Sequence, residues 1–224
     1  TILNSCQSVS LGLIPRKKIL TAIKAVARVS EVELEVVDGE RLEISFTEYH
    51  PYALWCPSTA LGTSDTANTG SCVFIDENGF AFDDAPNLVG GAFLRYADKN
   101  QSPQVGTSAF SADFIKDSVV LINYLNEKWQ FEVNMVSRQN EEESDYHLAE
   151  GGVLKVSARM SVEETLENLE TILTSEEFSH LRPGNFQYID LRYGNKVFVN
   201  EQTVALPMEI ENKNPAADLG SAAE

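Results

Sequence analysis

Short runs in which apolar and polar residues alternate, each ended by a turn signal, recur along this chain and constrain its fold more than any other feature. Residues 32–36 and 42–46 alternate in this way on either side of Asp38-Gly39. An Asp-Gly pair between alternating runs is typical of a β-hairpin turn. The chain therefore predicts an antiparallel hairpin. Helical spacing of apolar residues over 14–29, with Pro15 in the first turn, predicts a helix before it.

A second group of strand signals follows residue 57, starting after a stretch rich in Ser, Thr, Gly and Asn that indicates a surface loop. The predicted strands are 73–75, 80–82, 131–136, two strands around Gly151-Gly152 of which 153–156 is the clearer, 188–193 and 196–199. The turn 76–79 joins the first two. Gly194-Asn195 joins the last two, which predicts a tight two-residue hairpin.

Two longer amphipathic helices are predicted at 111–128 and 161–181. Ser111 is placed to cap the first, and Ser161 with Glu164 forms a capping-box pattern at the start of the second. The apolar stripe of the second helix predicts Leu166, Leu169 and Leu173 buried and Glu163, Glu167 and Glu170 exposed. The chain is therefore expected to be α+β, with a mostly antiparallel β domain that carries its helices on one face.

The chain is strongly acidic, with a formal net charge of -17 over 224 residues. This charge repels phosphate backbones and anionic lipids, so nucleic acid is not an expected partner. No apolar run approaches the ~20 residues of a membrane helix. Because the sequence begins at Thr1, we expect that it lacks a natural N-terminal segment.

Cys56 and Cys72 stand at the two ends of the Ser- and Gly-rich loop. A disulfide between them would indicate an oxidising compartment and would stabilise the fold by roughly 3 kcal/mol in the chain-entropy model. The alternative is two unrelated small residues, and the spacing leaves both readings open. Cys6 is expected to be a free thiol.

No catalytic, metal-binding or cofactor-binding motif is found. His50, His147 and His180 lack metal-ligand spacing and are expected to be surface or turn residues. The stretch 76–79 resembles the start of a calcium loop but is better explained as a hairpin turn. The acidic run 141–143 is expected to be a solvated turn.

Several strings, in the same order along the chain, resemble the FtsQ/DivIB family of bacterial cell-division proteins. After the first helix and hairpin, Glu48, Pro51, Ala53 and Trp55 match the end of that family's POTRA domain. The segment 74–82 resembles its hydrophobic-Asp-x-x-Gly-x-x-Phe hairpin, with Pro86-Asn87-Leu88 after it, and 166–173 the helix before its last strands. Tyr-Ile-Asp-Leu-Arg-Tyr at 188–193 matches a string of the family almost letter for letter. The resemblance implies a partial POTRA-like domain at 1–55, an FtsQ-type β domain at 56–206 and a flexible tail at 207–224.

The resemblance implies a non-enzymatic scaffold of the division complex. Such a protein crosses the plasma (inner) membrane once, with this region on the extracytoplasmic or periplasmic side at the division septum. It binds FtsL-like and FtsB/DivIC-like partners and, through them, helps recruit or regulate the septal peptidoglycan synthases FtsW and FtsI. The partner is expected to add a strand to the edge of the sheet. The expected partner-binding residues are Arg192, Tyr193, Gly194, Asn195, Lys196, Val197, Phe198, Val199 and Asn200.

Two alternatives remain at this stage. One is a POTRA-containing component of an outer-membrane assembly or secretion system. The other is a secreted enzyme that acts on cell-wall polymer, which would require a cleft with a carboxylate of raised pKa at Asp83, Asp84 or Asp190.

Overall fold

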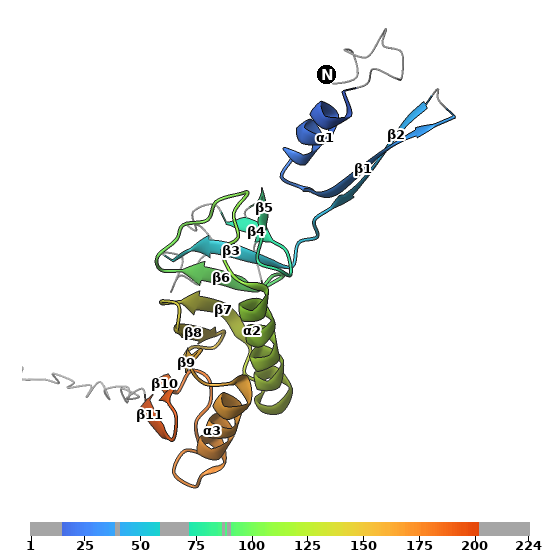
Figure 1. Ribbon diagram of the computed structural model, residues 1–224. Helices are drawn as coiled ribbons and strands as arrows, with labels where there is room; N and C mark the ends of the chain where they lie inside the picture. Colours follow the sequence, from blue (N-terminus) through green and yellow to red (C-terminus); the bar gives the residue numbers. More distant parts are fainter. Residues whose placement is uncertain (1–14, 39–40, 59–71, 87, 89–90, 202–224) are drawn as a thin grey trace, which may run out of the picture.

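The computed structural model describes residues 15–38, 41–58, 72–86, 88 and 91–201 (Figure 1). Predictions for Cys6, for most of the 57–71 loop and for the tail from residue 207 fall outside the described residues. Within them lie three α-helices, one π-helix and eleven strands. The helices are α1 (Arg16–Lys24), α2 (Ala112–Tyr124), α3 (Val162–Thr174) and the π-helix η4 (Leu125–Trp129). The strands are β1 (Val29–Val37), β2 (Arg41–Glu48), β3 (Ala53–Pro57), β4 (Val73–Ile75), β5 (Ala81–Asp84), β6 (Arg95–Asp98), β7 (Val133–Arg138), β8 (Glu143–Leu148), β9 (Val153–Ser157), β10 (Phe186–Tyr193) and β11 (Lys196–Glu201).

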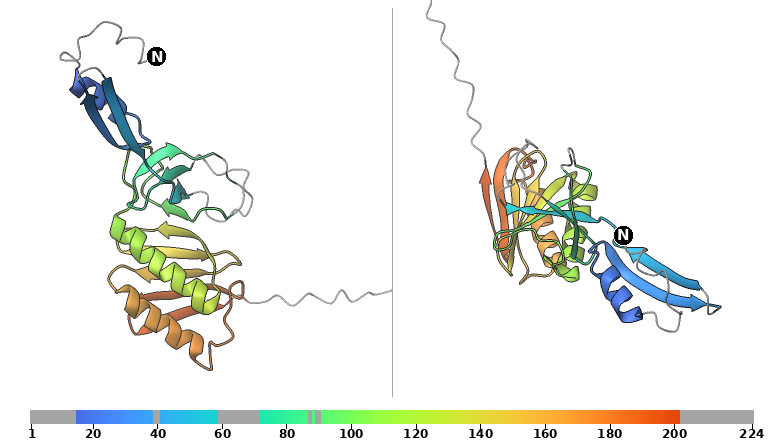
Figure 2. Two further views of the ribbon diagram at one scale, coloured as in Figure 1. Left: turned by 90° about the vertical axis from the view of Figure 1, so that its right-hand side faces the viewer. Right: turned by 90° about the horizontal axis from the view of Figure 1, so that it is seen from above.

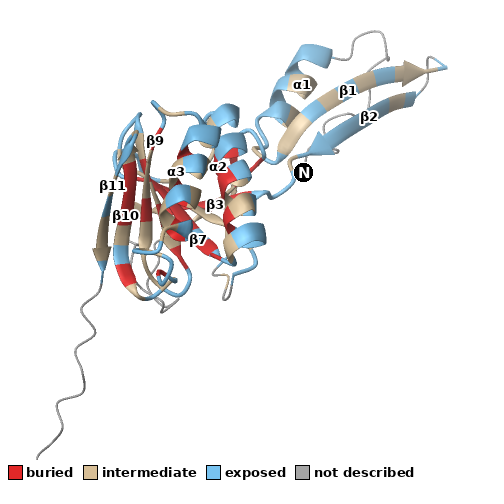
Figure 3. Cartoon of the chain, turned by 90° about the horizontal axis from the view of Figure 1, so that it is seen from below, coloured by how far each residue is buried: buried red, intermediate tan, exposed pale blue. Residues whose placement is uncertain are grey.

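The first unit is the predicted hairpin with α1 packed along β1. Val37 pairs with Arg41 across the turn, and Asp38 adopts a positive φ of 54°, as the Asp-Gly signal requires. Helix α1 ends at Lys24, earlier than predicted, because the chain turns there and enters β1 at Val29. No described residue between 15 and 52 is buried, which Figure 3 shows as the absence of red on α1, β1 and β2. This unit therefore has no closed hydrophobic core within the described residues.

The second unit is a nine-stranded sheet in the order β11-β10-β9-β8-β7-β6-β3-β4-β5. Most neighbours are antiparallel, and three pairs are parallel: β3 with β6, β6 with β7, and β9 with β10. The expected α+β class with a mostly antiparallel sheet is confirmed. The chain passes from the small sheet to the large one between Glu48 and Ala53, so the predicted boundary at residue 55 falls inside β3.

Helices α2 and α3 lie side by side on one face of the large sheet (Figures 1 and 2). Each connects two parallel strands, α2 between β6 and β7 and α3 between β9 and β10, as parallel pairing requires of a crossover. The main core fills the space between the helices and the sheet, around Trp55, Tyr96, Leu154 and Ile189.

The caps of both long helices are confirmed. Ser111 accepts a hydrogen bond from the backbone N–H of Phe114, and Ser161 forms the capping box with Glu164. Leu169 and Leu173 are buried, Leu166 is half-buried, Glu163 and Glu167 are exposed, and Glu170 is half-exposed and paired with Lys128.

The predicted end of the third helix at residue 181 is wrong, because α3 ends at Thr174. Ser175 adopts extended backbone angles, and its hydroxyl donates to the carbonyl of Ile172. Such a side-chain bond offers the backbone an alternative to the helix.

A smaller core of Leu54, Cys56, Ala97 and Met135 lies on the other face of the sheet. Cys56 on β3 and Cys72 just before β4 form a disulfide, with Cα atoms 4.3 Å apart. The two cysteines lie close together because Trp55, next to Cys56, pairs with Val73, next to Cys72, across the antiparallel strands β3 and β4. Of the two readings left open by the sequence, the bridged one holds.

The two units meet through a few specific contacts. Arg28 forms an ion pair of 3.2 Å with Asp83, and the ring of Tyr49 contacts those of Phe80 and Phe82, with centroids 5.0 and 5.5 Å away. Asp83 therefore has a structural partner.

Candidate partner-binding edge

Strand β11 forms one end of the large sheet and pairs with β10 alone among the described strands. Tyr193 pairs with Lys196, and Gly194 has a φ of 62°, so Gly194-Asn195 forms the predicted two-residue turn. The expected edge position of β11 is confirmed. Its outer side presents backbone N–H and C=O groups that no described strand engages.

Side chains of this hairpin divide between the core and the surface. Val197 and Val199 pack against the main core. Tyr193 and Phe198 are 54% and 53% exposed, and their rings touch edge to face with centroids 5.4 Å apart. An exposed aromatic pair therefore lies beside the open edge.

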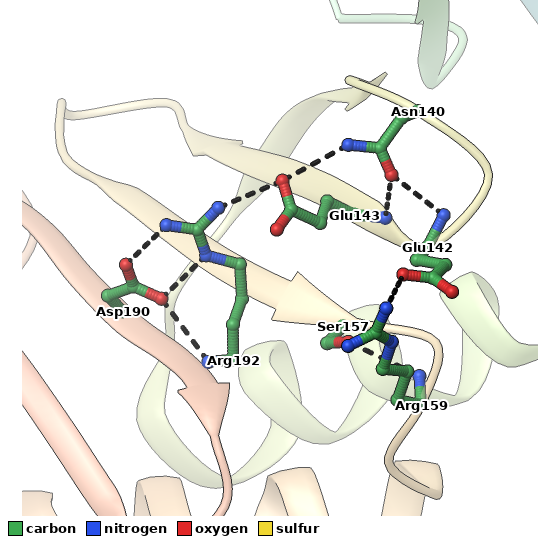
Figure 4. Close-up of polar contacts among 7 residues, drawn as sticks. All are labelled: Asn140, Glu142, Glu143, Ser157, Arg159, Asp190 and Arg192. Carbon is green, nitrogen blue, oxygen red and sulfur yellow. Dashed lines mark hydrogen bonds and ion pairs between the residues drawn. The ribbon is translucent and has the colours of Figure 1, made fainter.

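Arg192 stands at the centre of a charged network beside this aromatic pair (Figure 4). Its Nε and Nη2 donate to the two carboxylate oxygens of Asp190 at 2.8 and 2.6 Å, and its Nη1 lies 3.0 Å from Glu143. The guanidinium also lies 5.5 Å from the ring of Tyr193. A bidentate pair of this kind holds the guanidinium in one orientation.

The network changes the acidity of its members. Burial alone would raise the pKa of Asp190, but the hydrogen bonds from Arg192 outweigh it and the pKa is lowered. The same hydrogen bonds raise the pKa of Arg192, against an opposing effect of burial. Both groups therefore stay charged through the physiological range.

This network was not foreseen from the sequence, which predicted an Arg192 free to pair with a partner. Two of its five N–H donors are hydrogen-bonded to Asp190, and its Nη1 also forms an ion pair with Glu143. Arg192, Asp190 and Glu143 together carry a formal charge of −1. A backbone carbonyl of a partner therefore suits the remaining N–H donors of Arg192 better than an acidic side chain does.

The run 141–143 is not a turn throughout. Glu143 begins β8, where it binds Arg192, and only the residues before it form the turn. A recognisable signal existed, since Glu143 opens the alternating stretch 143–148. Its partner lies too far along the chain for a local pattern to show.

The face of the sheet around this network is lined by charged and aromatic groups. Lys155 pairs with Asp190 on one side and Asp145 on the other in the strand register, and its Nζ lies 4.9 Å from the centroid of the Tyr188 ring. Burial raises the pKa of Asp145 and lowers that of His147. The prediction that His147 is a surface or turn residue is wrong, because it lies within β8 and its Nε2 is buried without a partner among the described residues.

Asp76 and Asp190 are both held by nearby hydrogen-bond donors. Across the described ranges, no three His, Cys, Asp or Glu side chains are grouped to hold a metal ion. Asp76 accepts hydrogen bonds from the backbone N–H groups of Asn78 and Phe80, so the turn interpretation of 76–79 is confirmed. The pKa of Asp190 is lowered, the opposite of what the enzyme alternative requires of it.

In the described parts of the chain, no helix is long and apolar enough to cross a lipid bilayer. Comparison of the sequence with protein-family profiles and with curated proteins finds no match. The fold and the edge thus define a class, an α+β protein with an open edge strand on a large mixed sheet.

Proposed function

We propose that this chain is a non-enzymatic scaffold that binds a partner protein by adding a strand of that partner to β11. The observation that carries the proposal is the edge itself. Strand β11 has six residues and pairs on one side only among the described strands, and the exposed rings of Tyr193 and Phe198 flank it. Main-chain bonds along such an edge give affinity, and side chains beside it give specificity.

The two aromatic rings are expected to supply more binding energy than the charged groups. Covering the exposed half of a Tyr or Phe removes on the order of 100 Å² from water, worth about 2.5 kcal/mol per ring. A solvent-exposed ion pair is worth about 1 kcal/mol or less. Tyr193 and Phe198 are therefore the proposed anchors, and Arg192 the group that orients Tyr193 and donates to the partner's backbone.

The resemblance to the FtsQ/DivIB family suggests which partner this is. The string 188–193 that carries the resemblance coincides with β10, and β11 follows it directly. We therefore propose an FtsB/DivIC-like strand as the ligand of this edge, in a complex that includes an FtsL-like protein and acts on FtsW and FtsI. The corresponding location is the extracytoplasmic side of the inner membrane at the division septum.

The proposal is tested by titrating this chain with the extracytoplasmic segment of an FtsB/DivIC-like protein in a calorimeter. Tyr193→Ala and Phe198→Ala should each weaken binding at least tenfold, because each removes one anchor. Tyr52 and Phe46 are 42% and 57% exposed but lie away from β11, so Tyr52→Ala and Phe46→Ala serve as matched controls. Equal losses in the edge and control variants, or no binding by the parent chain, would reject the proposal.

A further inference from the structure

A cleft of about 460 Å³ opens on the helix-bearing side of the large sheet. It lies between the N-terminal ends of α2 and α3 and the ends of β7, β8 and β9. Strand β8 separates it from the edge network, because Tyr146 faces the helices while Asp145 and His147 face the other way. Its volume lies within the ordinary range of ligand sites.

Three carboxylates line this cleft without a charged partner. Asp113 and Asp117 lie one turn apart on α2, and Glu141 lies in the turn before β8. None of the three forms an ion pair or side-chain hydrogen bond with another described residue. Neighbouring like charges on a helix are unfavourable, so the unpaired carboxylates lower the stability of the fold. A cation bound between them would restore that stability.

The two arginines that also line the cleft do not neutralise these groups. Arg138 is bound to Asp98 and donates to the carbonyl of Ala109, and its guanidinium lies over the Phe110 ring. Arg159 is paired with Glu142. The charge left over inside the cleft is therefore that of the three carboxylates.

Tyr146 supplies a further polar group that faces the cleft. The residue is only 4% exposed and lines the cleft, and its hydroxyl makes no hydrogen bond with any residue that the structure describes. Burial, with smaller contributions from Tyr96 and Asp117, raises the pKa of this phenol. The hydroxyl is not among the fully buried side-chain atoms that lack a partner, so it opens onto the cleft, where an entering group can pair with it.

Part of the remaining wall is apolar, with Phe114, Leu121, Val156 and Val162. We propose that this cleft binds a cationic side chain of a partner protein, an arginine, whose methylene stem lies on the apolar wall and whose guanidinium meets the three carboxylates and the Tyr146 hydroxyl. Arginine offers five donors for these several acceptors, and its stem packs on apolar surface.

An anion is the less suitable occupant. The helix N-termini at the cleft are partly satisfied, since Ser111 and Ser161 cap them and Asp113 and Glu164 stand in their first turns. The free carboxylates would also repel an anion. The chain's net charge of -17 further favours a basic partner.

The test is a titration of the ¹⁵N-labelled chain with the pentapeptide acetyl-Gly-Ala-Arg-Ala-Gly-amide, followed by NMR. We expect saturable shifts centred on the amides of α2 and α3 that line the cleft. The same peptide with neutral citrulline in place of arginine should bind at least tenfold more weakly. The double variant Asp113→Asn/Asp117→Asn should lose at least tenfold in affinity for the arginine peptide, and Tyr146→Phe should lose severalfold.

Controls separate this site from general acidity and from the β11 edge. Glu163→Gln/Glu167→Gln makes the same change in net charge on exposed positions of α3 outside the cleft, and it should alter affinity less than twofold. Phe198→Ala should leave arginine-peptide binding intact. Equal binding of the citrulline peptide, or equal losses in the two double variants, would overturn the proposal.

Discussion

Removing the guanidinium of Arg192 tests the energetics of the charged network at the edge. The change Arg192→Gln deletes two charged hydrogen bonds to Asp190, whose side chain is only 8% exposed, and leaves that carboxylate with one backbone bond of 3.2 Å. Breaking a fully buried ion pair costs about 3–5 kcal/mol. The Arg192 side chain is 21% exposed, so water offsets part of this cost. We expect a loss of about 2–3 kcal/mol in the free energy of unfolding at neutral pH.

The pH dependence has a definite sign. In the parent chain the pKa of Asp190 is lowered, so its contribution is present above the unfolded value of about 3.9 and is lost as the pH falls through the folded pKa. In Arg192→Gln, burial is opposed only by the remaining backbone hydrogen bond and by Lys155, so the pKa of Asp190 is higher than in the parent chain. The penalty of the variant is then relieved as Asp190 takes up a proton. The stability difference between parent and variant should therefore be largest near pH 7 and shrink towards pH 3.

Urea unfolding at several pH values measures this difference. With a slope of roughly 2 kcal/mol per molar urea, the midpoint of the variant should fall by about 1–1.5 M at pH 7. Lys128→Gln breaks the exposed pair with Glu170 and serves as a control, with a much smaller change expected. A midpoint shift for Arg192→Gln no larger than that of the control, or a shift that grows towards low pH, would refute this reasoning.

Three further outcomes are expected. Replacing Cys56 and Cys72 by alanine should lower stability by roughly 3 kcal/mol, since the bridge spans 16 positions, and the peptides that carry them should be recovered joined in non-reduced mass mapping of the parent. Gly79→Ala should cost more than Gly106→Ala in thermal melts, because both have positive φ but only at Gly79 would the new Cβ lie 2.3 Å from the carbonyl oxygen of Phe110. Amides of β1 and β2 should exchange with deuterium faster than those of β7 and β8, because none of the described residues of the hairpin unit is buried; equal protection would show that it closes a core of its own.

Local features of the fold were predictable because their causes are local. The Gly194-Asn195 turn sets its hairpin through two adjacent residues, the first hairpin closes next to Asp38 with Val37 paired to Arg41, and Ser111 and Ser161 cap helices through bonds that span three residues. The edge position of β11 followed from its place as the last strand after a tight turn. These signals depend on the identity of neighbouring residues and do not require knowledge of the whole sheet.

The remaining features depend on contacts between distant segments. The parallel pairing of β3 with β6 joins strands on either side of β4 and β5, and no sequence period reveals it. Nothing near Arg192 indicates that Glu143 will bind it, because the two meet only once β8 and β10 are placed by β9 between them. The cleft could not be predicted from the sequence for the same reason, since Asp113, Glu141 and Tyr146 come from three separate segments.

The position of β3 inside the sheet has a consequence for the order in which the protein forms during synthesis. Strand β3 reaches residue 57, but its parallel neighbour β6 begins only at Arg95. At roughly 5–20 residues per second, one side of β3 stays unpaired for about 2–8 s after β3 is made. During that time the antiparallel partner β4 and the Cys56–Cys72 bridge can already hold β3 in register. The apolar residues Leu54 and Trp55 nevertheless lie on an unpaired strand edge until β6 is made, so a nascent chain that ends before Arg95 offers an edge at which another chain can pair.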